Sequence, residues 1–230
     1  MKVVLRVALL ITVGIAIAVG GLVGWFYTGV GLPRLASLHE YKAQQNSKVF
    51  AADGSLLCEL KGDQDREIIA LDEMPDAIRK AVIAVEDTEF YRHRGVNWKA
   101  VVRALWANVV KGSVVEGGST ITQQYVKGAY VGARRTLWRK IEEAHLAYEL
   151  EQKYSKDKIL ELYLNDIYFG QGCYGVFTAA RKYFGKPPAA LTLGECSMLA
   201  GIIQSPSYYD PYKKPQEVMA RRRIVLNAML

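Results

Sequence analysis

The chain has 230 residues, enough for one domain of ordinary size and an anchoring segment. Half of the residues are hydrophobic and 23% are charged, which excludes an intrinsically disordered chain. A formal net charge of +7 is compatible with nucleic acid, but for a domain outside the membrane it favours an anionic lipid surface or a phosphate-bearing substrate.

The first predicted element is a membrane anchor. The uncharged run from Val7 to Tyr27, VALLITVGIAIAVGGLVGWFY, would form a helix of roughly 30 Å, the thickness of a bilayer core. A secretory signal peptide is the alternative, although its apolar part is usually only about 7–15 residues long. Lys2 and Arg6 precede the run, which places the N-terminus in the cytoplasm. We therefore expect residues 1–28 to be a cytoplasmic tail and a single-pass anchor, with the folded part outside the cytoplasm.

Residues 29–70 are expected to form a linker and a short β segment. The sequence SKVFAADGSLLCEL contains two short extended pieces on either side of Asp53 and Gly54. An Asp-Gly pair between extended pieces is typical of a hairpin turn. The sequence therefore predicts a small β hairpin before the main domain.

Residues 71–230 are expected to form one mainly α-helical domain. LDEMPDAIRKAVIAVED places Ile78, Val82 and Val85 on one helical face, and VNWKAVVRALWANVVKG carries a wide apolar stripe. After a loop, the chain is expected to enter another helix near Thr120. Later helices are predicted in the segments TLWRKIEEAHLAYELEQKY, SKDKILELYLNDIYFG, VFTAARKYFG, TLGECSMLAGII and PQEVMARRRIVLNAML. The predicted fold class is mainly α, with one small β element before it.

One motif for a serine nucleophile and one for nucleotide binding are incomplete. Ser155 and Lys158 match the S-x-x-K signature of serine penicillin-interacting enzymes, but no S-D-N-like or K-T-G element follows. We therefore interpret Ser155 as the N-cap of its helix. GGSTITQQ lacks the residue order of a phosphate-binding P-loop, so nucleotide hydrolysis is not supported.

The cysteines and histidines give no metal-binding pattern. Cys58, Cys173 and Cys196 are an odd number without metal spacing, and we expect them to be small buried apolar residues. The three histidines include no H-E-x-x-H motif, so a zinc site is not expected.

Glu86 is the first candidate for acid–base chemistry. It continues a helix from the apolar run AVIAV. A carboxylate beside apolar walls has a raised pKa, which suits a general base near neutral pH. A solvated carboxylate at a helix end is the alternative. His93 and Gly95 are expected at a tight turn nearby, where His93 is either structural or chemical.

A second group of charges lies in RRTLWRKIEE. Arg139 and Glu143 are one helical turn apart and can pair, which on an exposed surface stabilises a helix by only about 0.3–0.5 kcal/mol. The functional alternative is a pocket in which Arg135, Arg139 and Lys140 hold a diphosphate around Glu143. Cations suit that work because a diphosphate leaving group gains negative charge as its bond breaks.

The segment GGSTITQQYVK, residues 117–127, is rich in hydrogen-bonding groups. It combines glycines, hydroxyls and amides with a terminal lysine. Either a surface loop or a site for a sugar and a phosphate has this composition.

Taken together, these segments resemble a known family. EDTEFYRHRG, GGSTITQQYVK, RKIEE, KDKILELYLNDIYFGQGCYG and RRRIVL occur in the order of the five motifs of the family 51 peptidoglycan glycosyltransferases, the bacterial cell-wall polymerases. The match covers residues 71–230, and the N-terminal anchor also resembles that family. A monofunctional enzyme and the glycosyltransferase part of a class A penicillin-binding protein both remain open. The DGSLLCEL segment resembles the bifunctional proteins, which would continue after RRRIVLNAML into a transpeptidase domain.

The resemblance implies a lysozyme-like, mainly α fold at the bacterial cytoplasmic (inner) membrane. It implies polymerisation of lipid II into linear β-1,4 glycan strands, with inversion and release of undecaprenyl diphosphate. By similarity, Glu86 is the base that takes a proton from the acceptor 4-hydroxyl, and Glu143 is the second acidic residue, near the donor diphosphate. The cations expected around the phosphates are Arg103, Lys127, Arg135, Arg139 and Lys140. The other expected substrate-binding residues are Asp87, Phe90, His93, Gly95, Gly118, Ser119, Thr120, Gln123 and Gln124.

The resemblance also implies partners. We expect lipid II, the growing glycan chain, membrane lipid and other cell-wall synthesis and division proteins, but no nucleic acid. No cofactor is required, and a divalent cation such as Mg²⁺ at the donor diphosphate remains an open alternative. Asn165, Arg221 and Arg222 match positions interpreted as structural. We expect the apolar face between Trp98 and Val109 to enter the bilayer as well as pack the core.

Two other functions compete with polymerisation. A lysozyme-like glycan hydrolase also uses two carboxylates, about 6.5–9.5 Å apart when it inverts. The clustered cations argue against it, because a neutral glycan leaving group needs a general acid. An inactive, membrane-anchored cell-wall scaffold is the other alternative, and the presence of both Glu86 and Glu143 argues against it.

Overall fold

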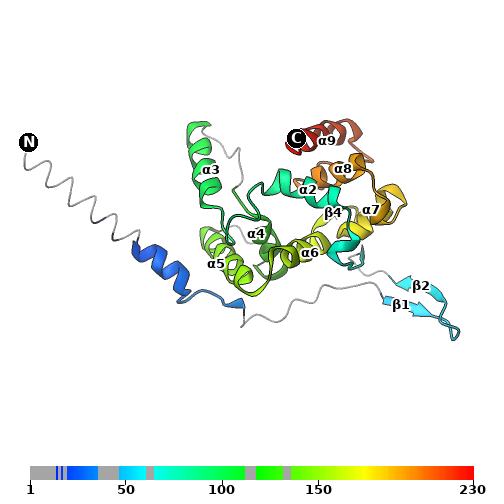
Figure 1. Cartoon of the computed structure of the whole chain (residues 1–230), viewed down its shortest axis with the longest axis horizontal. Coiled ribbons are helices and arrows are strands. Elements are labelled where there is room, and N and C mark those ends of the chain that lie inside the picture. The colour runs from blue at the N-terminus through cyan, green and yellow to red at the C-terminus, as the bar shows by residue number, and fades with distance from the viewer. Residues whose placement is uncertain are drawn as a thin grey trace, which may run out of the picture.

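The computed structural model describes residues 14, 17, 20–35, 47–60, 65–111, 118–131 and 136–230. Figure 1 shows a helix at residues 20–28, a separate hairpin and a helical body that ends at the C-terminus. Residues 1–13 of the expected anchor lie outside the described residues. Within the described ranges, no helix has the length and apolar character needed to cross a membrane.

The helical body contains the elements that position the candidate site. Its helices are α2 (Asp76–Glu86), α3 (Trp98–Lys111), α4 (Ile121–Val126), α5 (Leu137–Lys153), α6 (Lys156–Asp166), α7 (Val176–Phe184), α8 (Leu193–Ile203) and α9 (Pro215–Ala228). Short 3₁₀ turns occur at η2 (Leu71–Glu73) and η4 (Pro188–Ala190), and the π-helical turn η3 (Lys127–Val131) continues α4. The mainly α prediction is confirmed.

The predicted hairpin is confirmed as β1 (Ser47–Phe50) and β2 (Leu56–Leu60). The two strands are antiparallel. Gly54 has φ +83°, a left-handed conformation that favours glycine, and Asp53 Oδ1 accepts a hydrogen bond from the Ser55 backbone N–H at 2.9 Å. The turn chemistry of the Asp-Gly pair therefore sets the position of the hairpin.

The cysteine prediction is only partly correct. Cys173 and Cys196 are buried, as expected for small apolar residues. Cys58 is exposed, because it lies on β2 of the two-stranded hairpin, which stands apart from the helical body (Figure 1). The expectation of burial is wrong for Cys58.

A second, unexpected sheet joins the start of the domain to its middle. It consists of β3 (Asp65–Arg66), β5 (Cys173–Tyr174) and β4 (Tyr168–Gly170), with β5 in the centre. Arg66 is fully buried, forms an ion pair with Asp166 at 2.7 Å and lies over the Tyr174 ring at 5.0 Å. A charged contact, and not an apolar one, therefore attaches β3 to the end of α6.

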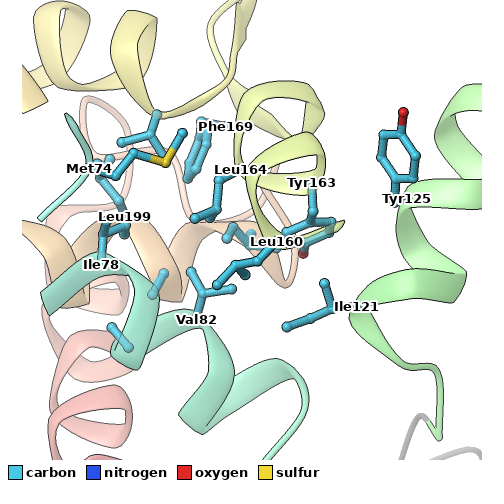
Figure 2. Packing of buried hydrophobic residues seen from close by; sticks show 14 of the residues in the cluster. Met74, Ile78, Val82, Ile121, Tyr125, Leu160, Tyr163, Leu164, Phe169 and Leu199 are labelled. Carbon is cyan, nitrogen blue, oxygen red and sulfur yellow. The ribbon is translucent and has the colours of Figure 1, made fainter. Parts of the chain in front are cut away.

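The hydrophobic core lies between α2, α4, α6 and α8. Figure 2 shows Ile78 and Val82 of α2 facing Leu160 and Leu164 of α6, with Leu199 of α8 beside them. The predicted inner face of α2 is confirmed at Ile78 and Val82, whereas Val85 packs at the edge of the core and stays partly exposed. The end of α2, at Glu86, is thereby held next to α4 and α6.

Helix α3 stands at one end of the body and leaves much of its apolar stripe uncovered (Figure 1). Trp98, Val102, Trp106 and Val110 are 52%, 65%, 73% and 66% exposed, whereas Ala104 is buried. Phe26, in the helix at residues 20–28, packs against Trp98 and Val101 at the start of α3. The stripe is therefore mostly a surface feature. The expected core packing is seen only for a few of its side chains.

Candidate active site

Glu86 is the last residue of α2, and its carboxylate is in contact with α4. The Gln124 side-chain amide donates a hydrogen bond to Glu86 Oε2 at 2.7 Å. Burial raises the pKa of Glu86; the Gln124 amide and the Arg221 charge oppose this rise, and the Asp87 charge adds to it. This direction agrees with the expected rise in the pKa, and a carboxylate buried against α4 does not fit the alternative of a solvated helix-end carboxylate.

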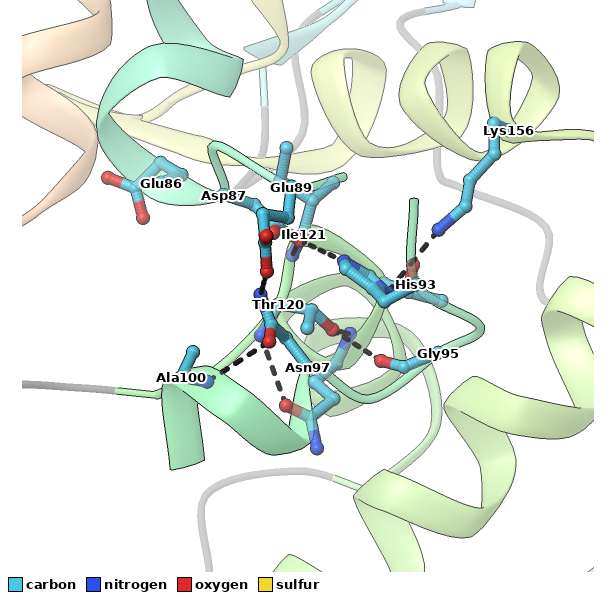
Figure 3. A network of polar contacts seen from close by, with 12 residues as sticks. Glu86, Asp87, Glu89, His93, Gly95, Asn97, Ala100, Thr120, Ile121 and Lys156 are labelled. Atoms are coloured by element: carbon cyan, nitrogen blue, oxygen red, sulfur yellow. Dashed lines mark hydrogen bonds and ion pairs between the residues drawn. The ribbon is translucent and has the colours of Figure 1, made fainter. Parts of the chain in front are cut away.

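Asp87, next in the chain, holds the start of α4 against the end of α2. Its Oδ2 accepts a hydrogen bond from the Ile121 backbone N–H at 3.1 Å and lies 2.8 Å from His93 Nε2 (Figure 3). Lys156 Nζ lies 3.5 Å from the other ring nitrogen of His93. These contacts give both Asp87 and His93 a structural role beside the candidate base.

Lys156 and Glu151 complete this buried network. Lys156 Nζ donates to Glu151 Oε1 at 2.7 Å and lies 4.4 Å from the centre of the Phe90 ring. Burial lowers the pKa of Lys156, while Glu151 and Asp87 oppose that shift. Phe90 is fully buried, so its ring supports the network from the core side.

Gly95 and Thr120 fix the entrance to α4. Gly95 has φ +77°, and a Cβ there would lie 2.6 Å from the Tyr148 backbone nitrogen. Thr120 Oγ1 donates to the Gly95 carbonyl at 2.6 Å, and the same hydroxyl accepts from the Gln123 N–H at 3.2 Å. Gln123 returns a side-chain bond to the Thr120 N–H at 3.0 Å, which completes a capping box. Both side chains are therefore buried and used by the fold, and neither is exposed as a substrate-binding residue would be.

Glu143 lies on α5 among cations, as the motif RRTLWRKIEE predicts. Its side chain is 1% exposed. Arg139 Nε lies 3.2 Å from one carboxylate oxygen, and Lys140 Nζ lies 3.0 Å from the other. Because the carboxylate is buried and paired with two cations, this cluster differs from an ordinary pair on a solvated helix surface.

Lys140 also connects this cluster to the α4 entrance. Its ammonium group donates to Ser119 Oγ at 2.8 Å. Residues 118–124, here called the connecting segment, thus contact Glu86 through Gln124 and the Glu143 cluster through Ser119. The structure therefore places the two candidate carboxylates on either side of one short stretch of chain.

The other expected site residues are more dispersed. Gly118 packs against α3, where a Cβ would lie 3.2 Å from Val101 Cα. Lys127 is exposed at the start of η3, and Arg103 is exposed on α3. Arg135 lies outside the described residues. In the part of the chain that the structure describes, no group of three or more His, Cys, Asp or Glu residues could hold a metal ion.

Two residues next to Glu86 were not identified as functional from the sequence. Tyr163 of α6 donates its phenol hydrogen to Gln124 Oε1 at 3.0 Å. Arg221 of α9 matches a position expected to be structural, yet its charge lowers the pKa of Glu86. Tyr163 follows the apolar face of α6, so the sequence pattern identifies it only as a core residue.

Comparison with known proteins assigns the chain to a family. Residues 53–230 match the family model described as Transglycosylase. The chain therefore belongs to the transglycosylase family, the family 51 glycosyltransferases, and the resemblance seen in its motifs is confirmed.

The relatives it matches are much longer proteins. It is 46% identical over 199 residues to penicillin-binding protein 1A from Neisseria lactamica, which covers 86% of this chain and 25% of that protein. Penicillin-binding protein 1A from Aquifex aeolicus is 42% identical over 216 residues, covering 94% of this chain and 30% of the relative. A crystal structure of penicillin-binding protein 1A from Haemophilus influenzae is 27% identical, with a TM-score of 0.45, and covers 82% of this chain and 18% of that one. The chain thus spans about a quarter of the length of the first curated relatives.

Proposed function

We propose that this chain is a peptidoglycan glycosyltransferase that polymerises lipid II into β-1,4 glycan strands and releases undecaprenyl diphosphate. The observation that carries the proposal is the position of Glu86. It is a carboxylate with a raised pKa, joined by the connecting segment to a cationic cluster around Glu143. Membership of the transglycosylase family supports the same reaction class.

Glu86 acts as the general base in this proposal. It takes the proton from the 4-hydroxyl of the acceptor sugar while that oxygen attacks the anomeric carbon of the donor. The new bond forms on the face opposite the diphosphate, so the configuration inverts, and the electrons of the broken carbon–oxygen bond leave with undecaprenyl diphosphate. Desolvation raises the pKa of Glu86 toward neutrality, which makes it a stronger base than a solvated carboxylate.

Arg139 and Lys140 stabilise the departing diphosphate. Two cations surround one carboxylate, which leaves an excess of positive charge at the cluster. Lys140 is 45% exposed, so its ammonium group is the one with access to a ligand. Glu143 holds these cations in place and is therefore a positioning residue. Lys127, Arg103, Arg135 and a Mg²⁺ ion at the diphosphate stay predictions.

The exposed face of α3 gives the lipid part of the substrate a place to reside. Phe26, in the helix at residues 20–28, packs edge-on against Trp98 at 5.9 Å, and its carbonyl lies 2.9 Å from His145 Nδ1. An apolar cavity of about 480 Å³ lies here, lined by Leu22, Val23, Trp25, Phe26, Tyr27, Trp98 and Ile141. We propose that this surface contacts the inner membrane, with the helical body outside the cytoplasm and folded in the lysozyme-like arrangement.

Purified protein supplied with lipid II tests the proposal. We expect linear glycan and undecaprenyl diphosphate as products, and no cleavage when finished glycan is supplied instead. The hydrolase alternative predicts the reverse pattern. A scaffold predicts neither product, and its partner binding would survive replacement of both Glu86 and Glu143.

A further inference from the structure

We infer that Tyr163 is a positioning residue for Glu86, because its hydroxyl fixes which end of the Gln124 amide faces that carboxylate. The inference rests on the proposed function, in which Glu86 is the base. It extends the site from α2 and α4 into α6, the helix that carries Tyr163.

Two hydrogen bonds in series carry the argument. Tyr163 is 1% exposed, and its hydroxyl donates to Gln124 Oε1 at 3.0 Å. Gln124 Nε2 then donates to Glu86 Oε2 at 2.7 Å. A side-chain amide has an acceptor end and a donor end, and the two are nearly equal in shape. Only the donor end can bond to a carboxylate.

The phenol decides between these two orientations. Its single hydrogen bonds to the amide carbonyl, which directs the NH₂ group toward Glu86. Turning the amide over would place its carbonyl against the carboxylate, with two acceptors and no hydrogen between them. Burial raises the pKa of Tyr163 well above its ordinary value, so the hydroxyl remains a donor throughout the working pH range.

The groups around Glu86 define what the loss of this hydroxyl would change. Asp87 follows Glu86 in the chain and raises its pKa, whereas Gln124 from α4 and Arg221 from α9 lower it. Without the Tyr163 hydroxyl, the amide is free to turn, and its support for the charged form of Glu86 weakens. The carboxylate then holds its proton to a higher pH and also loses its fixed direction.

The test is the pH dependence of lipid II polymerisation by the full chain. We expect Tyr163→Phe to move the acidic limb of the kcat profile to higher pH. At a given pH on the acidic limb, kcat of the variant should be about three- to tenfold below the wild-type kcat, since one pKa unit is a factor of ten. Above it, the rates should converge, while the KM for lipid II stays within about twofold of wild type because the hydroxyl faces Gln124 and not the substrate.

Two companion variants separate positioning from packing. Tyr183→Phe is the matched control, because it removes a partly buried hydroxyl that donates to the Phe169 carbonyl at 2.9 Å and is not among the groups that shift the pKa of Glu86. Its acidic limb should stay at the wild-type position. In a Gln124→Ala background, Tyr163→Phe should move the limb no further, because the hydroxyl acts through that amide.

Several results would overturn the inference. These are an unmoved limb in Tyr163→Phe, an equal loss of rate at every pH, and a limb that also moves in Tyr183→Phe. If Tyr163→Phe does not fold, Tyr163→Met removes the same hydroxyl with a side chain that adapts to the cavity. Glu86→Gln separates the two levels: wild-type polymerisation by that variant ends the base assignment, whereas an inactive Glu86→Gln with an unmoved Tyr163→Phe limb ends only the positioning role.

Discussion

Lys140 Nζ lies 3.0 Å from Glu143 Oε2, and the pair sits at the meeting point of α5 and the connecting segment. Glu143 is almost completely buried while Lys140 is nearly half exposed. The carboxylate therefore fixes a cation that remains accessible to a ligand. The Arg79–Asp76 and Lys186–Glu195 ion pairs differ, because their carboxylates are 68% and 20% exposed.

Lys140→Met should lower kcat/KM for lipid II by about 10- to 100-fold, the loss of roughly 1.5–3 kcal/mol from a charged hydrogen bond to the diphosphate. Steady-state kinetics measures the effect. Lys158→Met is the matched control, because Lys158 also pairs with a glutamate three residues later and is 48% exposed. It should leave kcat/KM unchanged, and equal losses in the two variants would contradict a role at the diphosphate.

Glu86→Gln should become more stable relative to wild type as the pH rises. The folded-state pKa of Glu86 is raised above its ordinary value of 4.5, so the folded chain binds this proton more tightly than the unfolded chain. That contribution is fully present below pH 4.5 and is lost as the pH rises through the folded-state pKa. At pH 8 the variant should unfold roughly 2–4 °C above wild type, the shift produced by about 1 kcal/mol.

Glu195→Gln is the control with the opposite sign. The Lys186 side chain lowers the pKa of Glu195, with the Thr192 backbone N–H contributing as well. Its stabilisation is present above the ordinary pKa and is lost as the pH falls through the folded-state value. This variant should therefore unfold below wild type at pH 8. Thermal unfolding between pH 4 and pH 8 would contradict the account if the Glu86→Gln difference shrank as the pH rose.

Features set by residues close together in the sequence can be predicted from it, whereas contacts between distant residues cannot. The Asp53-Gly54 turn and the cap at Ser155 depend on residues within four positions of each other, and the sequence predicts both. Tyr163 and Gln124 are 39 residues apart, and α6 brings them together only in the folded core. A pattern of apolar residues along α6 contains no information about the amide opposite it.

The small second sheet shows the same limit. Strand β5 has two residues and β4 has three, too few for a period-two pattern to appear. The sequence does not predict the capping roles of Thr120 and Gln123, for another reason. Hydroxyl and amide residues suit both a sugar site and a helix cap, and only the Gly95 carbonyl opposite Thr120 decides between them.

Gly95→Ala should destabilise the fold by roughly 2–4 kcal/mol, because it combines a positive φ with a collision against backbone atoms. A Cβ at this position would lie 2.6 Å from the Tyr148 nitrogen and 2.7 Å from the Ala147 carbonyl carbon, which are backbone atoms of α5. Gly54→Ala is the control, since it has a similar φ but open space around it, and should cost only about 1 kcal/mol. Denaturant unfolding that gives equal costs would show that the close approach is unimportant.

Trp106→Glu should weaken binding to vesicles containing anionic lipid by at least tenfold in a form lacking residues 1–28, because a charge then replaces the most exposed aromatic side chain on α3. Activity on lipid II should fall in parallel. Leu193→Glu introduces the same charge at a 52% exposed apolar residue of α8 and should leave binding unchanged. Unaltered vesicle sedimentation by Trp106→Glu would remove α3 from the membrane contact.

The most direct test of Glu86 as the general base is the rate of lipid II polymerisation by Glu86→Gln at neutral pH. The substitution keeps the shape of the side chain and its contact with Gln124 but removes the base. If Glu86 is the base, kcat should fall by about 10²–10⁴-fold or more, with thermal unfolding still cooperative. Polymerisation at the wild-type rate by this variant would contradict that role.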